Sequence, residues 1–205
     1  ATDLFYDAGE VSFSYVQTPF PGYGGDFAAA GEALPPDGQL PPGQTAAVGG
    51  ASVIATADTV QTAIYAVTDN QDGTYDFALV ALSTDWYPTP GTYPVDPTGG
   101  PAVFGFVDDA TSFVLPDTLD QEHVMDWLLD LPAAHKLVSA AGTLTLAGAD
   151  EDTLHGTFSG TMVDVDDPFF LVNLSDGRFA LSGADDVISD VPTAALAPTL
   201  SAGPN

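Results

Sequence analysis

Residues 142–146 read Gly-Thr-Leu-Thr-Leu, and residues 156–162 read Gly-Thr-Phe-Ser-Gly-Thr-Met, with an acidic turn between them. Apolar residues alternate with small hydroxyl residues in both runs, and this two-residue period is typical of a strand with one buried face. A second hairpin is expected around the turn at 175–177, Ser-Asp-Gly, because alternating runs flank it on both sides. Residues 142–183 therefore predict a series of antiparallel hairpins.

The same pattern occurs near the start of the chain. Residues 9–13 (Gly-Glu-Val-Ser-Phe) align with 142–146, and residues 25–29 (Gly-Asp-Phe-Ala-Ala) align with 156–160. Two explanations stay open at this point. The match indicates either a structural pseudo-repeat, with two similar hairpins at opposite ends of one sheet system, or only the composition that hairpins share.

The rest of the chain extends this pattern. Strands are expected in a meander over 46–82, which contains an Asp-Gly hairpin signal, and over 102–107. Residues 34–44 and 84–100 are rich in proline and glycine and are expected to be loops. One short α-helix is predicted around 118–130, because a capping pattern precedes an apolar stripe that a proline ends. The sequence thus predicts a mainly β fold, an antiparallel β-sandwich or open barrel of about ten strands.

The length of 205 residues suits one β domain over 1–205, and a hydrophobic content of 45% is enough for a core. The two ends of the chain, about 1–8 and 190–205, read as extended segments. We expect them to serve in contacts between subunits.

The charge of the chain is extreme. There are 29 acidic residues and only two cations, Lys136 and Arg178, which gives a formal net charge of -27. Nucleic acids and anionic membranes are therefore poor partners, because they attract proteins through lysine and arginine. Strong self-repulsion is relieved by salt or cations, which favours a secreted or cell-surface location, with a signal peptide already removed.

The chain lacks the residues and motifs of several other protein classes. It has no cysteine, so neither disulfides nor thiol chemistry are expected. No apolar run reaches 18 residues, so no membrane insertion is expected. Zinc-protease, serine-hydrolase and phosphate-loop motifs are absent, and the abundance of aspartate makes any chosen carboxylate pair uninformative. The sequence therefore predicts a protein that is not an enzyme.

Calcium is the one cofactor that the sequence supports, because calcium prefers hard oxygen ligands from turns. No acidic turn matches the EF-hand pattern, and the alternative is that these turns are simply solvated. The candidate metal ligands are Asp69, Asp72, Asp150, Asp152, Asp164, Asp166 and Asp167.

Three aromatic residues lie in the predicted loop over 84–100: Trp86, Tyr87 and Tyr93. Aromatic rings in loops can stack on sugar rings or contact a partner surface, so these residues are candidates for ligand binding, with surface glycans among the ligands. The alternative is that they hold the loop against the core.

Four motifs carry a resemblance to a known group. Residues 142–146, 156–160, 176–179 (Asp-Gly-Arg-Phe) and 90–93 (Pro-Gly-Thr-Tyr) are similar to segments of a loose group of bacterial exported β-rich envelope lipoproteins of unknown function. The resemblance implies an exported β domain and supplies no catalytic residues. The cysteine that would carry a lipid anchor in that group is absent from this chain.

Acidity without a catalytic signature, together with many strands, predicts an extracellular structural protein. We expect a subunit of a surface fibre, filament or adhesive assembly, in which copies of the chain join by strand addition and cations stabilise the assembly. The alternative is an extracellular module that binds a ligand or carbohydrate, with a calycin-like pocket or a site on its loops.

Overall fold

The computed structural model describes residues 3–56, 59–96, 98–113 and 121–183. Most of these residues lie in strands, as the sequence predicts. The elements are β1 Leu4–Tyr6, β2 Ala8–Thr18, β3 Gly24–Glu32, β4 Ala46–Thr56, β5 Thr59–Asp69, β6 Tyr75–Thr84, β7 Gly91–Val95, β8 Ala102–Ala110, α1 Gln121–Asp130, β9 His135–Ala149, β10 Thr153–Asp164 and β11 Leu171–Ser182. The prediction of a mainly β fold with one short helix is confirmed, with eleven strands in place of about ten.

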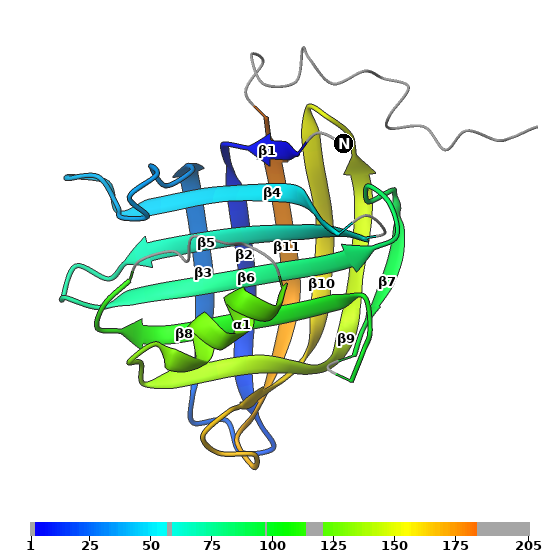
Figure 1. The fold of residues 1–205 in the computed structure, drawn as a ribbon. Helices are drawn as coiled ribbons and strands as arrows, with labels where there is room; N and C mark the ends of the chain where they lie inside the picture. The colour runs from blue at the N-terminus through cyan, green and yellow to red at the C-terminus, as the bar shows by residue number, and fades with distance from the viewer. Residues whose placement is uncertain (1–2, 57–58, 97, 114–120, 184–205) are drawn as a thin grey trace, which may run out of the picture.

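All eleven strands belong to one sheet, in the order β1-β4-β5-β6-β8-β7-β9-β10-β11-β2-β3. The sheet curls into an open barrel of two layers whose strands run across one another (Figure 1). We call β1, β4, β5, β6 and β8 the front layer, and β7, β9, β10, β11, β2 and β3 the back layer. Neighbouring strands are antiparallel, except for a single parallel pair between Val95 of β7 and Ala102 of β8.

Strand β9 belongs to both layers and turns the chain from one into the other. Its first residues pair with β8 in the front layer, and residues 142–146 pair with β7 while β10 pairs along its length. Gly142 and Gly160 face each other near the change of direction. A Cβ atom on Gly142 would lie 2.4 Å from the Ser159 carbonyl oxygen, so the close approach of the two backbones requires glycine there.

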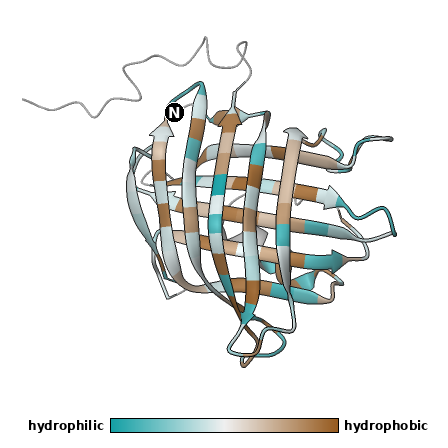
Figure 2. Ribbon diagram, turned by 180° about the vertical axis from the view of Figure 1, so that it is seen from behind, coloured by the Kyte–Doolittle hydropathy of each residue, from teal (hydrophilic) through white to brown (hydrophobic). Residues whose placement is uncertain are grey.

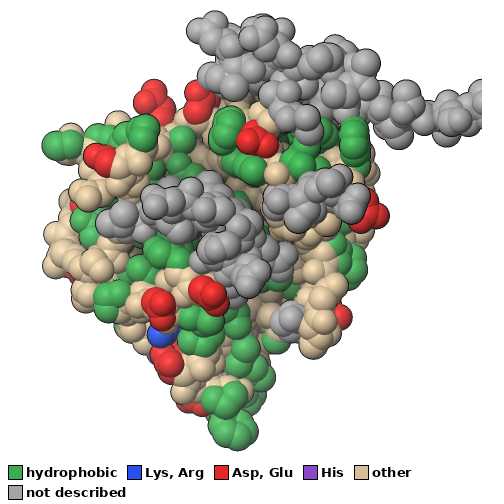
Figure 3. Space-filling model, viewed as in Figure 1, with side chains coloured by type: hydrophobic (Ala, Val, Ile, Leu, Met, Phe, Trp, Pro, Cys, Tyr) green, Lys and Arg blue, Asp and Glu red, His purple; other side chains and the backbone are tan. Residues whose placement is uncertain are grey.

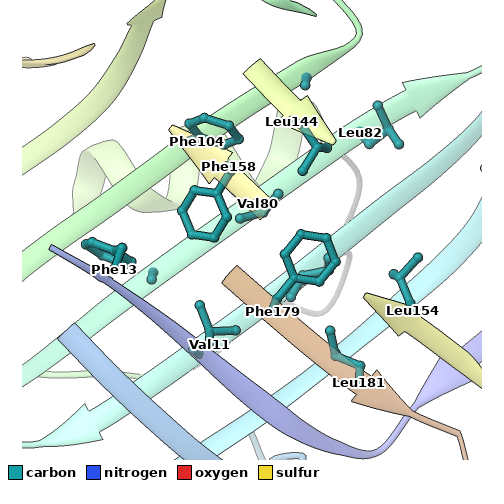
Figure 4. Close-up of a cluster of buried hydrophobic side chains, with 14 of the residues drawn as sticks. Val11, Phe13, Val80, Leu82, Phe104, Leu144, Leu154, Phe158, Phe179 and Leu181 are labelled. Atoms are coloured by element: carbon teal, nitrogen blue, oxygen red, sulfur yellow. The ribbon is translucent and has the colours of Figure 1, made fainter. Parts of the chain in front are cut away.

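The main core lies between the two layers. Along β10 and β11 of the back layer, buried apolar residues alternate with exposed residues, as the period of two dictates, and the hydropathy colours of the back strands change in the same way (Figure 2). The Phe13 ring lies 5.0 Å from Phe27, 5.2 Å from Phe106 and 5.9 Å from Phe158, so one aromatic cluster joins both layers. Aliphatic side chains such as Val80 and Leu144 fill the space around these rings (Figure 4).

A second apolar cluster covers the outer side of the front layer, where α1 lies across the strands (Figure 1). Leu128 of α1 is fully buried there, and the Phe77 ring packs against Phe113 and Trp127. A Cβ atom on Gly105 of β8 would lie 2.5 Å from a methyl carbon of Leu128, so this glycine makes room for the helix. Of the predicted helix, residues 118–120 lie outside the described part of the chain, as does the side chain of Val124.

Two sequence predictions need correction or sharpening. Residues 91–95 form strand β7 and are not part of a loop, because they pair along β9 despite their proline and glycine. The two hairpins of the suggested pseudo-repeat, β2–β3 and β9–β10, occupy the same layer and flank β11 on either side. Both therefore use the same alternation to cover the same core.

The start of the chain packs onto its own sheet. Strand β1 pairs with residues 50–52 of β4, its Leu4 and Tyr6 side chains are buried, and the Tyr6 hydroxyl donates to the carbonyl oxygen of Asp150 at 2.8 Å. The expected role of segment 1–8 in subunit contacts stays a prediction, and segment 190–205 lies outside the described residues. In the described part, no helix combines the length and the apolar character needed to cross a membrane.

Candidate functional site

The structure gathers polar groups in two places: a corner between the layers, and the outer face of the back layer. At the corner, β6 begins and β8 ends beside the β2–β3 loop. The carboxylates of Asp76, Asp108 and Asp109 each offer an oxygen within 4.8 Å of the others. This is the only set of three potential metal ligands at that spacing within the described ranges.

The β5–β6 turn holds two of these carboxylates in place. The Asn70 side chain donates to Asp76 at 2.8 Å, and the Thr74 hydroxyl donates to Asp109 at 3.0 Å. The backbone N–H of Asp109 also donates to Asp76 at 3.1 Å. Asp109 has a φ of 55°, a left-handed conformation that aspartate tolerates better than most residues, and this bend brings the two strand ends together.

The carboxyl of Asp108 has a shifted pKa. Burial raises the pKa of its carboxyl to about 6, a shift that Tyr23 opposes and the charges of Asp76 and Asp109 increase. The Tyr23 hydroxyl is closed off from solvent with Asp108 and Tyr15 as close neighbours, and burial raises the pKa of Tyr23 as well. The corner can therefore hold a proton near neutral pH, and its oxygens are of the type that calcium prefers.

His135 lies beside this corner. Its Nδ1 atom is 2.7 Å from the buried carboxylate of Asp164, and its ring stacks on Phe170 and contacts Tyr23. Asp164 also accepts a hydrogen bond from the backbone N–H of Asp166 at 2.9 Å. In the described part of the chain, no serine or threonine hydroxyl is bonded to His135, so this pair joins β9 to the end of β10 without the nucleophile that a hydrolase needs.

The predicted calcium ligands are distributed over three separate turns. Each turn uses its aspartate to bind its own backbone: Asp69 accepts from the N–H of Gln71, Asp72 from Thr74, and Asp150 from Asp152 and Thr153. Hydrogen bonds from Thr74 lower the pKa of Asp72. Asp167 accepts from the N–H of Phe169. Calcium at these turns stays a prediction.

The side chain of Asp166 lies 3.3 Å from the ammonium of Lys136, so one of the two cations in the chain is already paired with a predicted metal ligand. Nothing in the sequence distinguishes Asp76, Asp108 and Asp109 from the other aspartates. Their grouping depends on how β6 and β8 pair across the sheet. Only the paired sequence Asp108-Asp109 at the end of an apolar run could have pointed there.

The predicted aromatic ligands are only partly accessible. Tyr87 is 6% exposed and packs in the main core, and the half-buried Tyr93 donates its hydroxyl to the carbonyl oxygen of Thr89 at 2.7 Å. Trp86 is 46% exposed, and its ring lies 5.9 Å from that of Tyr87. Two of the three rings therefore hold the loop in place, which was the alternative explanation, and Trp86 alone has a substantial free surface.

The outer face of the back layer is rich in hydroxyl groups. One row crosses five strands, since register pairs Thr92 of β7 with Thr145 of β9, Thr145 with Thr157 of β10, Thr157 with Arg178 of β11, and Arg178 with Ser12 of β2. Thr143 and Ser159 pair in the next row. We call these seven residues the hydroxyl face.

Arg178 lies in the middle of this face. Its Nε atom donates to the Ser12 hydroxyl at 3.0 Å, and no carboxylate in the described residues forms an ion pair with it. A shallow groove of about 420 Å³ lies between Arg178, Thr145 and Thr157, and smaller grooves of about 300 and 190 Å³ border the same arginine. The face thus offers hydroxyl donors and acceptors beside one available guanidinium.

Comparison with protein-family models, with curated proteins and with solved structures finds no match for this chain. The similarity to exported envelope lipoproteins stays a prediction. The geometry of the corner and of the hydroxyl face is therefore the basis for proposing a function.

Proposed function

We propose that the chain is an extracellular, non-enzymatic structural protein of an adhesive assembly, and that it adheres to surface glycans through the hydroxyl face. The observation that carries the proposal is the row of hydroxyl groups that crosses five strands and includes an arginine without a carboxylate partner. Thr and Ser hydroxyls both donate and accept, so they can bond to the hydroxyls of a sugar in several orientations.

The hydroxyl residues of this surface stand together. Thr92, Thr143, Thr145, Thr157 and Ser159 form neighbouring positions without a carboxylate among them. Asp176 lines the groove beside Arg178, and Asp26 and Glu10 line the two smaller grooves, so the guanidinium must offset their charge when an anionic ligand binds. The guanidinium of Arg178 can form two parallel hydrogen bonds to a carboxylate, so the fitting glycan carries a uronic acid.

The packed core argues against the calycin-like version of the carbohydrate hypothesis. Phe158, which would line an internal pocket, is buried among the side chains of the main core, whereas Phe77 is buried in the cluster on the outer side of the front layer. The three grooves beside Arg178 lie on the outer face of the back layer. A glycan would therefore lie along the surface and not inside the barrel.

Assembly of several copies is the other half of the proposal. Strand β3 pairs with β2 on one side, and among the described strands none pairs with its other side. Such an edge can accept a strand from a second copy. A chain that sediments as a monomer at all salt and calcium concentrations would contradict this half and leave glycan binding to be judged separately.

The test of glycan binding is calorimetric titration with uronic-acid oligosaccharides in moderate salt. Arg178→Ala should weaken binding at least about tenfold, because a hydrogen bond to a charged group contributes about 1.5–3 kcal/mol. Arg178→Lys keeps the charge and loses the fork, so it should recover only part of the affinity. Lys136→Ala removes the other cation of the chain and should leave binding unchanged. Equal affinity of Arg178→Ala and the parent protein would refute the proposal.

A further inference from the structure

The most exposed aromatic side chains of the described part lie together at one end of the molecule. Phe169 is 89% exposed and Phe20 is 80% exposed. Thr18 pairs with Leu171, and each phenylalanine lies two residues beyond this last pair, one on the β2–β3 loop and the other on the β10–β11 loop. The prolines Pro19, Pro21 and Pro168 flank them and are exposed too. We call these five residues the aromatic tip.

Both loops project beyond the ends of the strands at the same side of the barrel (Figures 1 and 2). They are held by internal hydrogen bonds, in which the N–H of Gln17 donates to the carbonyl oxygen of Tyr23 and the N–H of Phe169 donates to the Asp167 carboxylate. The rings of Tyr23 and Phe170 lie 5.4 Å apart and join the bases of the loops. The two loops thus hold two phenylalanine rings toward solvent. Leaving these rings exposed forgoes the stabilisation that burial of an apolar side chain would provide.

Two carboxylates lie next to the tip on one of its loops. Asp166 and Asp167 are exposed on the β10–β11 loop, immediately before Pro168 and Phe169. The front view shows hydrophobic side chains at the lower end of the molecule, with acidic side chains and one cation above them (Figure 3). A partner of this tip should therefore present positive charge at its surface and apolar groups beneath.

The shape of the tip restricts the partner further. A projecting pair of rings would make little contact with a flat, rigid surface, whereas a fluid interface closes around it. Phosphatidylcholine presents quaternary ammonium groups outermost and acyl chains below, and aromatic rings attract quaternary ammonium ions. We propose that the aromatic tip inserts into zwitterionic, choline-bearing lipid surfaces.

Insertion into neutral lipid is compatible with the net charge of the chain. A formal charge of -27 disfavours anionic membranes, and the tip adds no cation beyond Lys136, which Asp166 already pairs. Insertion of two loop residues also differs from crossing a membrane. Binding should therefore be selective for neutral lipid, and anionic lipid should weaken it most at low salt, where repulsion is screened least.

The test is flotation of the full chain with phosphatidylcholine vesicles, and with the same vesicles doped with phosphatidylglycerol. The parent protein should float with the neutral vesicles and less with the doped ones. Phe20→Ser and Phe169→Ser should each reduce partitioning at least about tenfold, because each removes one buried ring from the lipid-bound state. Phe5→Ser is the matched control, since Phe5 is 47% exposed on β1 at the opposite end of the barrel.

A Phe169→Trp variant provides a second readout that does not depend on loss of binding. Its added emission should shift to the blue when neutral vesicles are present. Failure of the parent protein to float, or equal flotation of the Ser variants and the parent, would overturn the inference. If the Ser variants differed from the parent protein in oligomeric state but not in flotation, the inference would also be overturned, because the tip would then contact a second copy of the chain.

Discussion

The front and back layers are built from the same kind of strand and bury different numbers of faces. In β6 of the front layer, six consecutive residues from Phe77 to Leu82 are buried, because the main core covers one face and the α1 cluster covers the other. In β10 of the back layer, buried and exposed residues alternate from Thr153 to Ser159. A face that other elements cover cannot bind a ligand, and among the described residues only the back layer keeps a broad outer face free.

The sequence follows this difference. Strands buried on both faces read as continuous apolar runs, such as Ala78-Leu-Val-Ala-Leu82, whereas strands with one free face place hydroxyl residues at every second position. A substitution should therefore cost much in the front layer on either face. In the back layer it should cost much only at inward positions.

Phe77→Ala gives the largest effect that this comparison predicts. Phe77 is fully buried on the side of the front layer away from the main core, with the Trp127 ring at 4.8 Å and the Phe113 ring at 5.2 Å. Its loss should destabilise the fold by about 3–5 kcal/mol, the usual cost of truncating a buried phenylalanine. Urea unfolding of the variant and the parent protein measures this difference.

Trp127→Ala tests the same contact from the helix, because the Trp127 ring of α1 packs against Phe77. If α1 and its neighbours only rest loosely on the sheet, both variants should cost less than about 1 kcal/mol, as surface substitutions do. That result would mean that the front layer also has a free outer face, and the contrast between the layers would fail.

The sequence predicted the back layer better than the front layer for a physical reason. Strict alternation over 142–162 permits only one choice of inward face, so the hairpins and their buried residues could be stated in advance. A run that is buried on both faces has no such alternation, so its sequence does not show which residues face which side. The sequence therefore could not show which element covers Phe77. Strand β7 was missed because its proline and glycine, and the prolines before and after it, are typical of loops, and its pairing with β9 is a long-range contact.

The candidate sites were predictable to a smaller degree. Local patterns correctly indicated turns at Asp69, Asp72 and Asp150, but the same carboxylates bind their own backbones, so local pattern alone could not distinguish turn formation from metal binding. The corner of Asp76, Asp108 and Asp109 requires strands far apart in sequence to meet. The hydroxyl face likewise depends on register between five strands.

Asp108 gives a prediction of intermediate size at the corner where the two layers meet. Its pKa is about 6 in the folded protein, against an ordinary value of about 4 in the unfolded chain, so the folded state binds the proton more tightly. The stabilising contribution is fully present below pH ~4 and is lost as the pH rises through 6. After a discount for its partial exposure, the change should be about 1–2 kcal/mol.

Asp108→Asn should abolish this part of the pH dependence, measured by urea unfolding between pH 4 and pH 7. Asp72→Asn is a control that should leave the pH dependence in this window unchanged, because hydrogen bonds from Thr74 lower the pKa of Asp72 and its contribution is lost only below the ordinary pKa of about 4. The calcium prediction adds a second readout. A cation at the corner should stabilise the parent protein at pH 7 and have little effect on Asp108→Asn.

Thr157→Ala should give the smallest change in stability and the sharpest contrast with Phe77. Thr157 is exposed, and its neighbours Thr145 and Arg178 are held by strand pairing and not by its hydroxyl. Removing that hydroxyl should change the free energy of unfolding by less than about 0.5 kcal/mol. Binding of uronic-acid oligosaccharides should weaken several-fold, because one hydrogen bond contributes about 1 kcal/mol.

Thr153→Ala separates a local from a general effect. Thr153 also lies exposed on β10, but its hydroxyl donates to Asp150 at the turn, away from the groove beside Arg178. This variant should therefore leave glycan binding intact. If Thr157→Ala destabilised the fold as much as Phe77→Ala does, the outer face of the back layer would be part of the scaffold, and a free binding surface could not be argued from its hydroxyl groups.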